Sequence, residues 1–270
     1  ACTTSSFCTN MGYWCNGNAK IVVIKHNYNG GYIYSSYVHL SSYGIDCEDS
    51  LLNLIKEVHK IDGISRIRLG SLEPKIITEE FVKELSKLPK ICPHFHLSLQ
   101  SGCNATLKRM NRHYDSAEYR EIVKNLRNAF ENAAITTDIM VGFVGETEEE
   151  FEASVNLAKE IGFAKAHVFA YSRRAGTMAY NMPNQVTKAE KSKRSHLMIE
   201  ATAETESNFI KSYIGKTVEV LFETMDNGFA VGYTKNYLYV KVKSDKAYTG
   251  ELLNVKITDC EKEFAIGEIV

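Results

Sequence analysis

The sequence contains no long apolar run, no strong bias of charge and no paired-cysteine motif. No stretch of its 270 residues approaches the roughly 20 consecutive apolar residues that a membrane-spanning helix needs, so we expect no membrane partner. The formal net charge of -1 gives no overall indication of a polyanionic ligand. The first residues lack a basic segment followed by an apolar run, so no signal peptide is indicated and a cytoplasmic location is expected.

The cysteines do not form a recognisable metal or disulfide pattern. There are 7, and an odd number without a secretion signal argues against a disulfide framework. Cys2, Cys8 and Cys15 crowd the N-terminus, but their spacing matches neither the C-x2-C of a zinc site nor the C-x3-C-x2-C triplet of an iron–sulfur cluster. His94 and His96 share one strand face without a third ligand in view. No metal ligands are therefore identifiable in the sequence.

The chain divides into three parts by pattern. Residues 1–37 are rich in Asn, Tyr, Gly and Ser and form an atypical N-terminal segment, in which only 21–24 resembles a clean strand. From 38 to 212, strand-like runs alternate with amphipathic helices, which predicts an α/β domain with a parallel sheet. Four or five strand–helix units are visible there, too few for a full barrel of about eight strands. Residues 213–270 hold short apolar runs separated by turns, which is typical of a small all-β barrel.

Polar residues follow the strand-like run His94–Leu99. Gln100 and Ser101 come directly after it, at the carboxyl end where α/β folds place their chemistry. A side-chain amide and a hydroxyl at this position can bind ribose hydroxyls or a carboxylate. They can equally satisfy the backbone of their own turn, and the residues alone leave both alternatives open.

A second strand end lies in the segment 137–147. The buried-looking strand ends in Gly142 and Gly145, and Thr147 with Glu150 is expected to cap the helix that follows. Asp115 with Glu118 forms the same capping-box pattern for the helix before this strand. Glycines let a backbone approach a ligand closely, and a helix N-terminus favours anions, although a tight strand-to-helix turn has the same pattern. Asp138 is more informative, because a carboxylate inside an apolar strand needs partners.

Basic residues gather in two places. Lys108 and Arg109 are interpreted as a solvated helix face, whereas Arg173 and Arg174 follow a strand at the same edge as Gln100. A further group is interpreted as an exposed helix face, with contact to nucleic acid as the alternative. It comprises Lys188, Lys191, Lys193 and Arg194.

Several segments together resemble the radical SAM methylthiotransferases. They occur in the order and spacing of that family, and the first two resemble its threonylcarbamoyladenosine branch. The segments are SLEP (71–74), CPHFHLSLQSG (92–102), LKRMNRHY (107–114), TTDIMVGFVGETEEEF (136–151) and YSRRAGT (171–177). The C-terminal part, with GKTVEVLFE (215–223) and GYTKNYLYV (232–240), resembles the TRAM domain with which these enzymes bind tRNA.

The resemblance implies a partial (β/α) radical SAM barrel followed by a small all-β, OB-like TRAM domain. It implies a tRNA methylthiotransferase that adds a methylthio group to C2 of N6-threonylcarbamoyladenosine in the anticodon loop. The implied cofactors are S-adenosylmethionine and a 4Fe-4S cluster, while the sulfur and electron donors stay open. The residues that it places at the cofactor are Gln100, Ser101, Asp138, Ile139, Gly142 and Glu146, with Arg112 and Arg173 as contacts to a carboxylate or to RNA.

The sequence also departs from the family pattern. The cluster-binding cysteine triplet should precede the segment 39–44, but the chain begins too late to include it, which suggests an N-terminally truncated and inactive copy. The turn GFPGET of the family reads GFVGET, with Val144 in place of proline. One alternative is a non-catalytic RNA-binding remnant, although residues 213–270 hold seven Lys and no Arg against nine acidic residues. Another is a methylthiotransferase that acts on a ribosomal protein.

Overall fold

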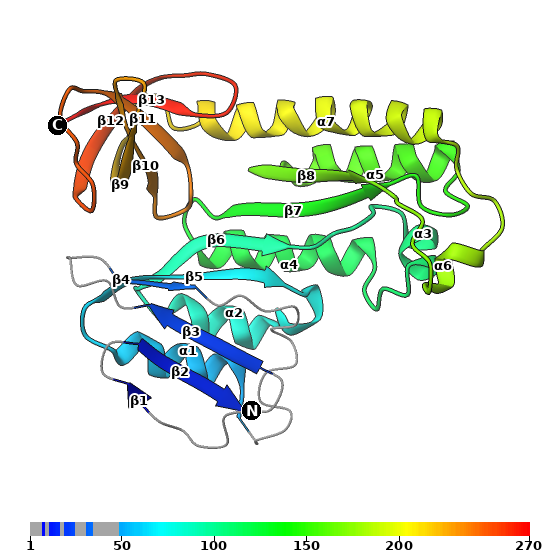
Figure 1. Cartoon of the computed structure of the whole chain (residues 1–270), viewed down its shortest axis with the longest axis horizontal. Helices are drawn as coiled ribbons and strands as arrows, with labels where there is room; N and C mark the ends of the chain where they lie inside the picture. Colours follow the sequence, from blue (N-terminus) through cyan, green and yellow to red (C-terminus); the bar gives the residue numbers. More distant parts are fainter. Residues whose placement is uncertain (1–6, 9–10, 17–18, 25–30, 35–48) are drawn as a thin grey trace.

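A large sheet followed by a small closed barrel makes up the computed structural model, which describes residues 7–8, 11–16, 19–24, 31–34 and 49–270 (Figure 1). The sheet contains β1 to β8 in sequence order, antiparallel up to β4 and parallel from β4 onward. Its strands are β1 Phe7–Cys8, β2 Met11–Asn16, β3 Ala19–Ile24, β4 Gly31–Tyr34, β5 Ile64–Leu72, β6 Ile91–Leu97, β7 Ala134–Val141 and β8 Lys165–Ala170. The predicted partial barrel with a parallel sheet is confirmed, and the strand expected at 21–24 lies in β3.

Helices connect the parallel strands. They are α1 Leu51–Lys60, α2 Glu79–Ser86, α3 Asn104–Arg109, α4 Ser116–Ala129, α5 Glu148–Ile161, α6 Met178–Asn181 and α7 Lys188–Lys211, with the 3-10 turn η2 at Pro74–Ile76. Both predicted capping boxes are present, because the side chains of Asp115 and Thr147 accept N3 amide protons while Glu118 and Glu150 accept from the cap backbone. In the described part of the chain, no helix is both long and apolar enough to cross a membrane.

The two faces of the parallel sheet differ in chemistry. On one face, alternate residues such as Phe95, Leu97 and Ile135 pack with the apolar sides of the helices in one continuous core. The opposite, inner face of β6 and β7 carries His94, His96, Thr136 and Asp138 instead. The inner face is therefore polar although the sheet belongs to a well-packed domain.

The C-terminal barrel closes in the order β10-β11-β13-β12-β9 around its own apolar core. Its strands are β9 Thr217–Asp226, β10 Phe229–Thr234, β11 Tyr239–Lys243, β12 Leu252–Cys260 and β13 Ala265–Ile269. The β9–β10 hairpin turns at Asn227 and Gly228, both with positive φ (50° and 80°), which matches a type I′ turn. The all-β expectation for this part is confirmed.

This barrel docks on the amino ends of the parallel strands (Figure 1). The buried guanidinium of Arg66 on β5 donates to the carbonyl of Tyr233 (3.1 Å) and to the Glu219 carboxylate (2.8 Å). Asn236 donates to the carbonyl of Asn132, directly before β7, at 2.7 Å. The carboxyl ends of the strands, where the candidate site residues lie, are thus left at the other end of the sheet.

Gly232 is the residue on which closure of the small barrel depends most directly. A Cβ atom there would collide with the backbone of Leu221 and lie 2.8 Å from the Cα of Phe222, in the neighbouring strand β9. We expect Gly232→Ala to destabilise the barrel by about 1–3 kcal/mol, because backbone atoms cannot move aside as a flexible side chain can. Hydrogen exchange of the β9–β13 amides measures this loss.

The matched control is Gly70→Ala in β5, where a Cβ would meet nothing within 4 Å. That substitution should change stability by less than about 0.5 kcal/mol. Equal exchange rates for the two variants would contradict the packing argument.

Candidate functional site

Gln100 continues the sheet beyond the end of β6. Its N–H donates to the carbonyl of Asp138 and its own carbonyl accepts from Met140, both at 2.8 Å, so that it pairs with Ile139 of β7. Its φ is 64°, a left-handed conformation that is unusual for glutamine and is found mostly where a site imposes it. Among the described residues, no hydrogen bond to its side-chain amide is found, so this amide is free to bind a ligand.

The side chain of Ser101 is turned toward α5. Its side chain is 0% exposed, its Oγ lies 3.0 Å from the Oγ of Ser154 on α5, and it accepts from the N–H of Cys103 at 3.2 Å. The N–H of Gly102 donates to the same Ser154 hydroxyl at 3.0 Å. Of the two alternatives, Ser101 therefore fixes the turn, and Gln100 is the residue of the pair that can face a ligand.

Asp138 finds its partner on the inner face of the sheet. Its Oδ2 lies 3.4 Å from Nε2 of His96, whose Nδ1 lies 3.1 Å from the hydroxyl of Thr136, and His167 stands opposite Asp138 on β8. The hydrogen bond from His96 lowers the pKa of Asp138, against the effect of partial burial. Ile139 is fully buried in the helix-facing core, so only its backbone is available at the site.

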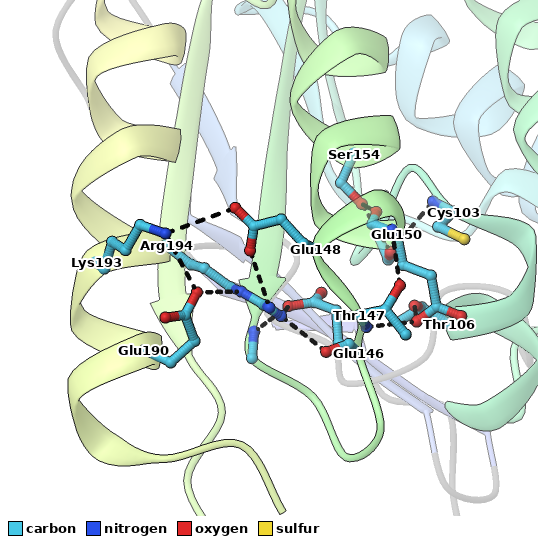
Figure 2. Close-up of polar contacts among 12 residues, drawn as sticks. Cys103, Thr106, Glu146, Thr147, Glu148, Glu150, Ser154, Glu190, Lys193 and Arg194 are labelled. Atoms are coloured by element: carbon cyan, nitrogen blue, oxygen red, sulfur yellow. Dashed lines mark hydrogen bonds and ion pairs between the residues drawn. The ribbon is translucent and has the colours of Figure 1, made fainter.

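The loop after β7 is closed by a buried carboxylate (Figure 2). Gly142 has a φ of 67°, and its N–H donates to Oε2 of Glu146 at 2.7 Å. Arg194 of α7 reaches the same oxygen at 2.8 Å and the carbonyl of Glu146 at 2.9 Å. Glu146 is 5% exposed, and this burial raises its pKa while Arg194 and the Gly142 amide oppose the rise. Glu146 thus holds the loop and does not face the solvent.

A second arginine holds the loop from the opposite side. Arg109 of α3 donates through Nε to the carbonyl of Val144 at 3.1 Å and through Nη1 to Glu150 at 2.9 Å. The interpretation of Arg109 and Arg194 as solvated helix faces is therefore wrong, whereas Lys108 is exposed as expected. Their contacts to the loop and to Glu150 come from more than 30 residues away in sequence. The local partners are Thr106, three residues before Arg109, and Glu190, four residues before Arg194.

The remaining predicted residues lie at the rim of this edge. Arg112 is exposed beyond α3. Arg173 is exposed beyond β8, its Nε donates to the carbonyl of Tyr180 at 2.6 Å, and its guanidinium lies 4.3 Å from the centre of the Tyr180 ring. Between the rim and the sheet lies a small apolar cluster. It consists of Phe143, Val144 and Tyr171, with Met110, Met140, Ala179 and Met182 around them.

The described residues do not fit an iron–sulfur cluster. Within them, no three His, Cys, Asp or Glu side chains come close enough to hold a metal ion, and Cys92, Cys103 and Cys260 are separate free thiols. The sequence prediction on Cys2, Cys8 and Cys15 concerns side chains outside the described part, as does the segment 39–44. The described residues do fit an organic cofactor, because the free Gln100 amide and the methionine-lined apolar side chains around Phe143 suit a ligand with polar and apolar parts.

Two family models match this chain. The Radical SAM superfamily model matches residues 26–158, which include β5, β6, β7 and the loop closed by Glu146. The TRAM domain model matches residues 211–270, which form the small barrel. Among solved structures, coproporphyrinogen III oxidase from Escherichia coli, described as a radical SAM enzyme, is similar with a TM-score of 0.48 and 15% identity. That match covers 59% of this chain and 37% of the oxidase chain.

Two curated relatives carry the same name, tRNA-2-methylthio-N(6)-dimethylallyladenosine synthase. The protein of Alkaliphilus oremlandii is 36% identical over 258 residues, covering 94% of this chain and 53% of its own length. The protein of Clostridium botulinum strain Hall is 37% identical over 235 residues, covering 85% and 52%. The chain thus spans about half the length of the curated relatives it matches. With its radical SAM and TRAM parts in the order that the motifs predicted, it belongs to the radical SAM tRNA methylthiotransferase family.

Proposed function

We propose that this chain forms the cofactor-binding and RNA-binding part of an enzyme that adds a methylthio group to C2 of an N6-modified adenosine in the anticodon loop of tRNA. The observation that carries the proposal is the similarity to relatives named for that modification, which extends over 94% of this chain and through both of its domains. S-adenosylmethionine and a 4Fe-4S cluster are the cofactors in this proposal, and tRNA is the partner.

For the substituent on N6, we propose threonylcarbamoyl. The segments 71–74 and 92–102 resemble that branch of the family. The inner face beside Gln100 is polar, with His96, Asp138 and His167 as neighbours on three adjacent strands. Such a face suits a substituent that has hydroxyl, amide and carboxylate groups better than an apolar one. Dimethylallyladenosine is the second candidate, because the relatives are named as synthases of its 2-methylthio derivative.

The residues at the carboxyl edge take different roles in this proposal. The Gln100 side chain and the backbone of Ile139 and Gly142 contact S-adenosylmethionine, and Asp138 borders the same space from the inner face. Arg112 and Arg173 contact a carboxylate or RNA at the rim. Glu146 is a positioning residue, since its carboxylate is occupied by the Gly142 amide and by Arg194.

Mass analysis of nucleosides tests the reaction and its substrate together. The full chain is reconstituted anaerobically with iron and sulfide and incubated with S-adenosylmethionine, a reductant and tRNA that carries either modification. We expect the methylthio product of threonylcarbamoyladenosine. Product only from dimethylallyladenosine would establish the second candidate, and tRNA binding without either product would indicate a non-catalytic RNA-binding protein.

Gln100→Gly separates ligand binding from turn formation. Glycine adopts the left-handed conformation at 64° without cost, so the variant should be about 0.5–1 kcal/mol more stable than the wild type. Loss of the amide should weaken binding of S-adenosylmethionine about tenfold, as expected for a lost hydrogen-bond donor and acceptor. Thermal unfolding and calorimetric titration measure the two effects, and unchanged affinity would show that Gln100 serves only the turn.

Arg194→Met tests the buried ion pair. The substitution leaves the Glu146 carboxylate buried beside one amide donor, so we expect a loss of about 3–5 kcal/mol at neutral pH. Burial already raises the pKa of Glu146, and removal of the guanidinium raises it further. The difference from wild type should therefore shrink as the pH falls through the raised pKa and Glu146 takes up a proton.

The control for this experiment is the double variant Glu146→Gln with Arg194→Met, measured with both single variants by denaturant unfolding. A neutral amide needs no cation, so the double variant should recover part of the stability that Arg194→Met loses. If it is as unstable as the single variant, lost packing of the arginine stem explains the effect and the charge argument fails.

A further inference from the structure

The segment that leads from β8 into α7 is rich in cations. Between residues 171 and 194 there are six basic side chains and one acidic side chain, in a chain whose net charge is -1. Lys193 and Arg194 form ion pairs with Glu190 and Glu148. In the described part of the chain, the other four form no ion pair with an acidic side chain. We call them the rim cations, and they are Arg173, Arg174, Lys188 and Lys191.

Two rim cations, Lys191 and Arg173, are neighbours near the carboxyl end of β7. The stem of Lys191 covers Gly142, where a Cβ atom would collide with its Cγ, and its Nζ lies 4.9 Å from the centre of the Tyr171 ring. Burial and the neighbouring charge of Arg173 lower the pKa of Lys191. Arg173 is held in place by the carbonyl and ring of Tyr180, which occupy only one of its five N–H groups. Two neighbouring cations without a carboxylate are unfavourable unless an anion joins them.

The hydroxyl of Tyr171 supplies an independent observation. Tyr171 is 9% exposed, its ring packs edge-on against Phe143 at 5.0 Å, and its buried hydroxyl has no hydrogen-bond partner among the described residues. A buried hydroxyl without a partner costs about 1–3 kcal/mol, so a water molecule or a ligand that accepts its hydrogen bond would be favourable here. This hydroxyl belongs to the residue over which the ammonium of Lys191 lies.

From this geometry we infer that Lys191, Arg173 and Tyr171 form a binding site for a backbone phosphate of RNA at the carboxyl edge of the sheet. The inference rests on the proposed function, in which RNA is the substrate. Arg174 and Lys188 extend the same cationic rim, which suits a polyanion better than one small carboxylate. The TRAM part has more acidic than basic residues, so its net charge does not attract a polyanion and the rim cations supply that attraction instead.

Binding of a fluorescent anticodon stem-loop by the full chain, measured at several salt concentrations, tests this site. Lys191→Gln and Arg173→Gln should each weaken binding about threefold to tenfold and reduce the magnitude of the salt slope by about one. Tyr171→Phe should also weaken binding, yet the free protein should be as stable as wild type or more so, because the unpartnered hydroxyl is gone. A purely structural role of Tyr171 would not give that combination.

Lys159→Gln is the matched control, because Lys159 is an exposed lysine in the last turn of α5, at the opposite end of the sheet. If all three site variants bind RNA like this control, while the wild type binds RNA, the site is wrong and the proposed function stands. If the wild type binds no RNA, the phosphate site and the proposed function are both wrong. The carboxylate of S-adenosylmethionine is the other anion considered for this site, and calorimetric titration with that cofactor tests it. Weaker binding of that cofactor with unchanged RNA affinity would assign the site to its carboxylate and overturn the proposal.

Discussion

The carboxylate of Glu146 is the constraint on which the carboxyl edge of the sheet depends. It is buried, and a buried carboxylate is tolerated only with donors around it, which here are the Gly142 amide and the Arg194 guanidinium. Because Arg194 belongs to α7, the same contact fixes that helix against the loop after β7. It therefore also positions Lys191, three residues before Arg194, over Gly142. One ion pair thus sets both the shape of the loop and the place of a rim cation.

The loop between β7 and α5 is held from both sides by long-range contacts. Arg109 reaches it from α3, and Arg194 reaches it from α7. Val144 stands where the family has proline, so the backbone has lost one source of rigidity. The two arginines restrain the loop through side chains, which makes a proline at this position less necessary. The side chains that can still change conformation at this edge are those without a partner in the described part of the chain, above all the Gln100 amide.

Local signals in the sequence predicted local structure well. The capping boxes of Asp115 and Thr147 involve residues three positions apart, and both are present. The contacts of Arg109 and Arg194 to the loop after β7 could not be predicted in this way, because the packing of α3, α5 and α7 brings these partners together. The same holds for Ser101, whose role in the turn depends on Ser154 of α5. Position at a strand end predicted which residues share this edge of the sheet, but the direction of each side chain required the fold.

The two candidate RNA contacts lie at opposite ends of the sheet. The TRAM barrel docks on the amino ends of the parallel strands (Figure 1), through Arg66 and Asn236. The rim cations belong to the segment between β8 and α7, and Lys191 covers Gly142 at the carboxyl end of β7. β7 has 8 residues, so the two ends are separated by about 26 Å at roughly 3.3 Å per residue. An RNA that contacts both ends must span that distance, which is several times the length of one nucleotide. A single nucleoside cannot satisfy both contacts. A stem with its loop can do so, which favours recognition of a folded anticodon arm over recognition of the modified nucleoside alone.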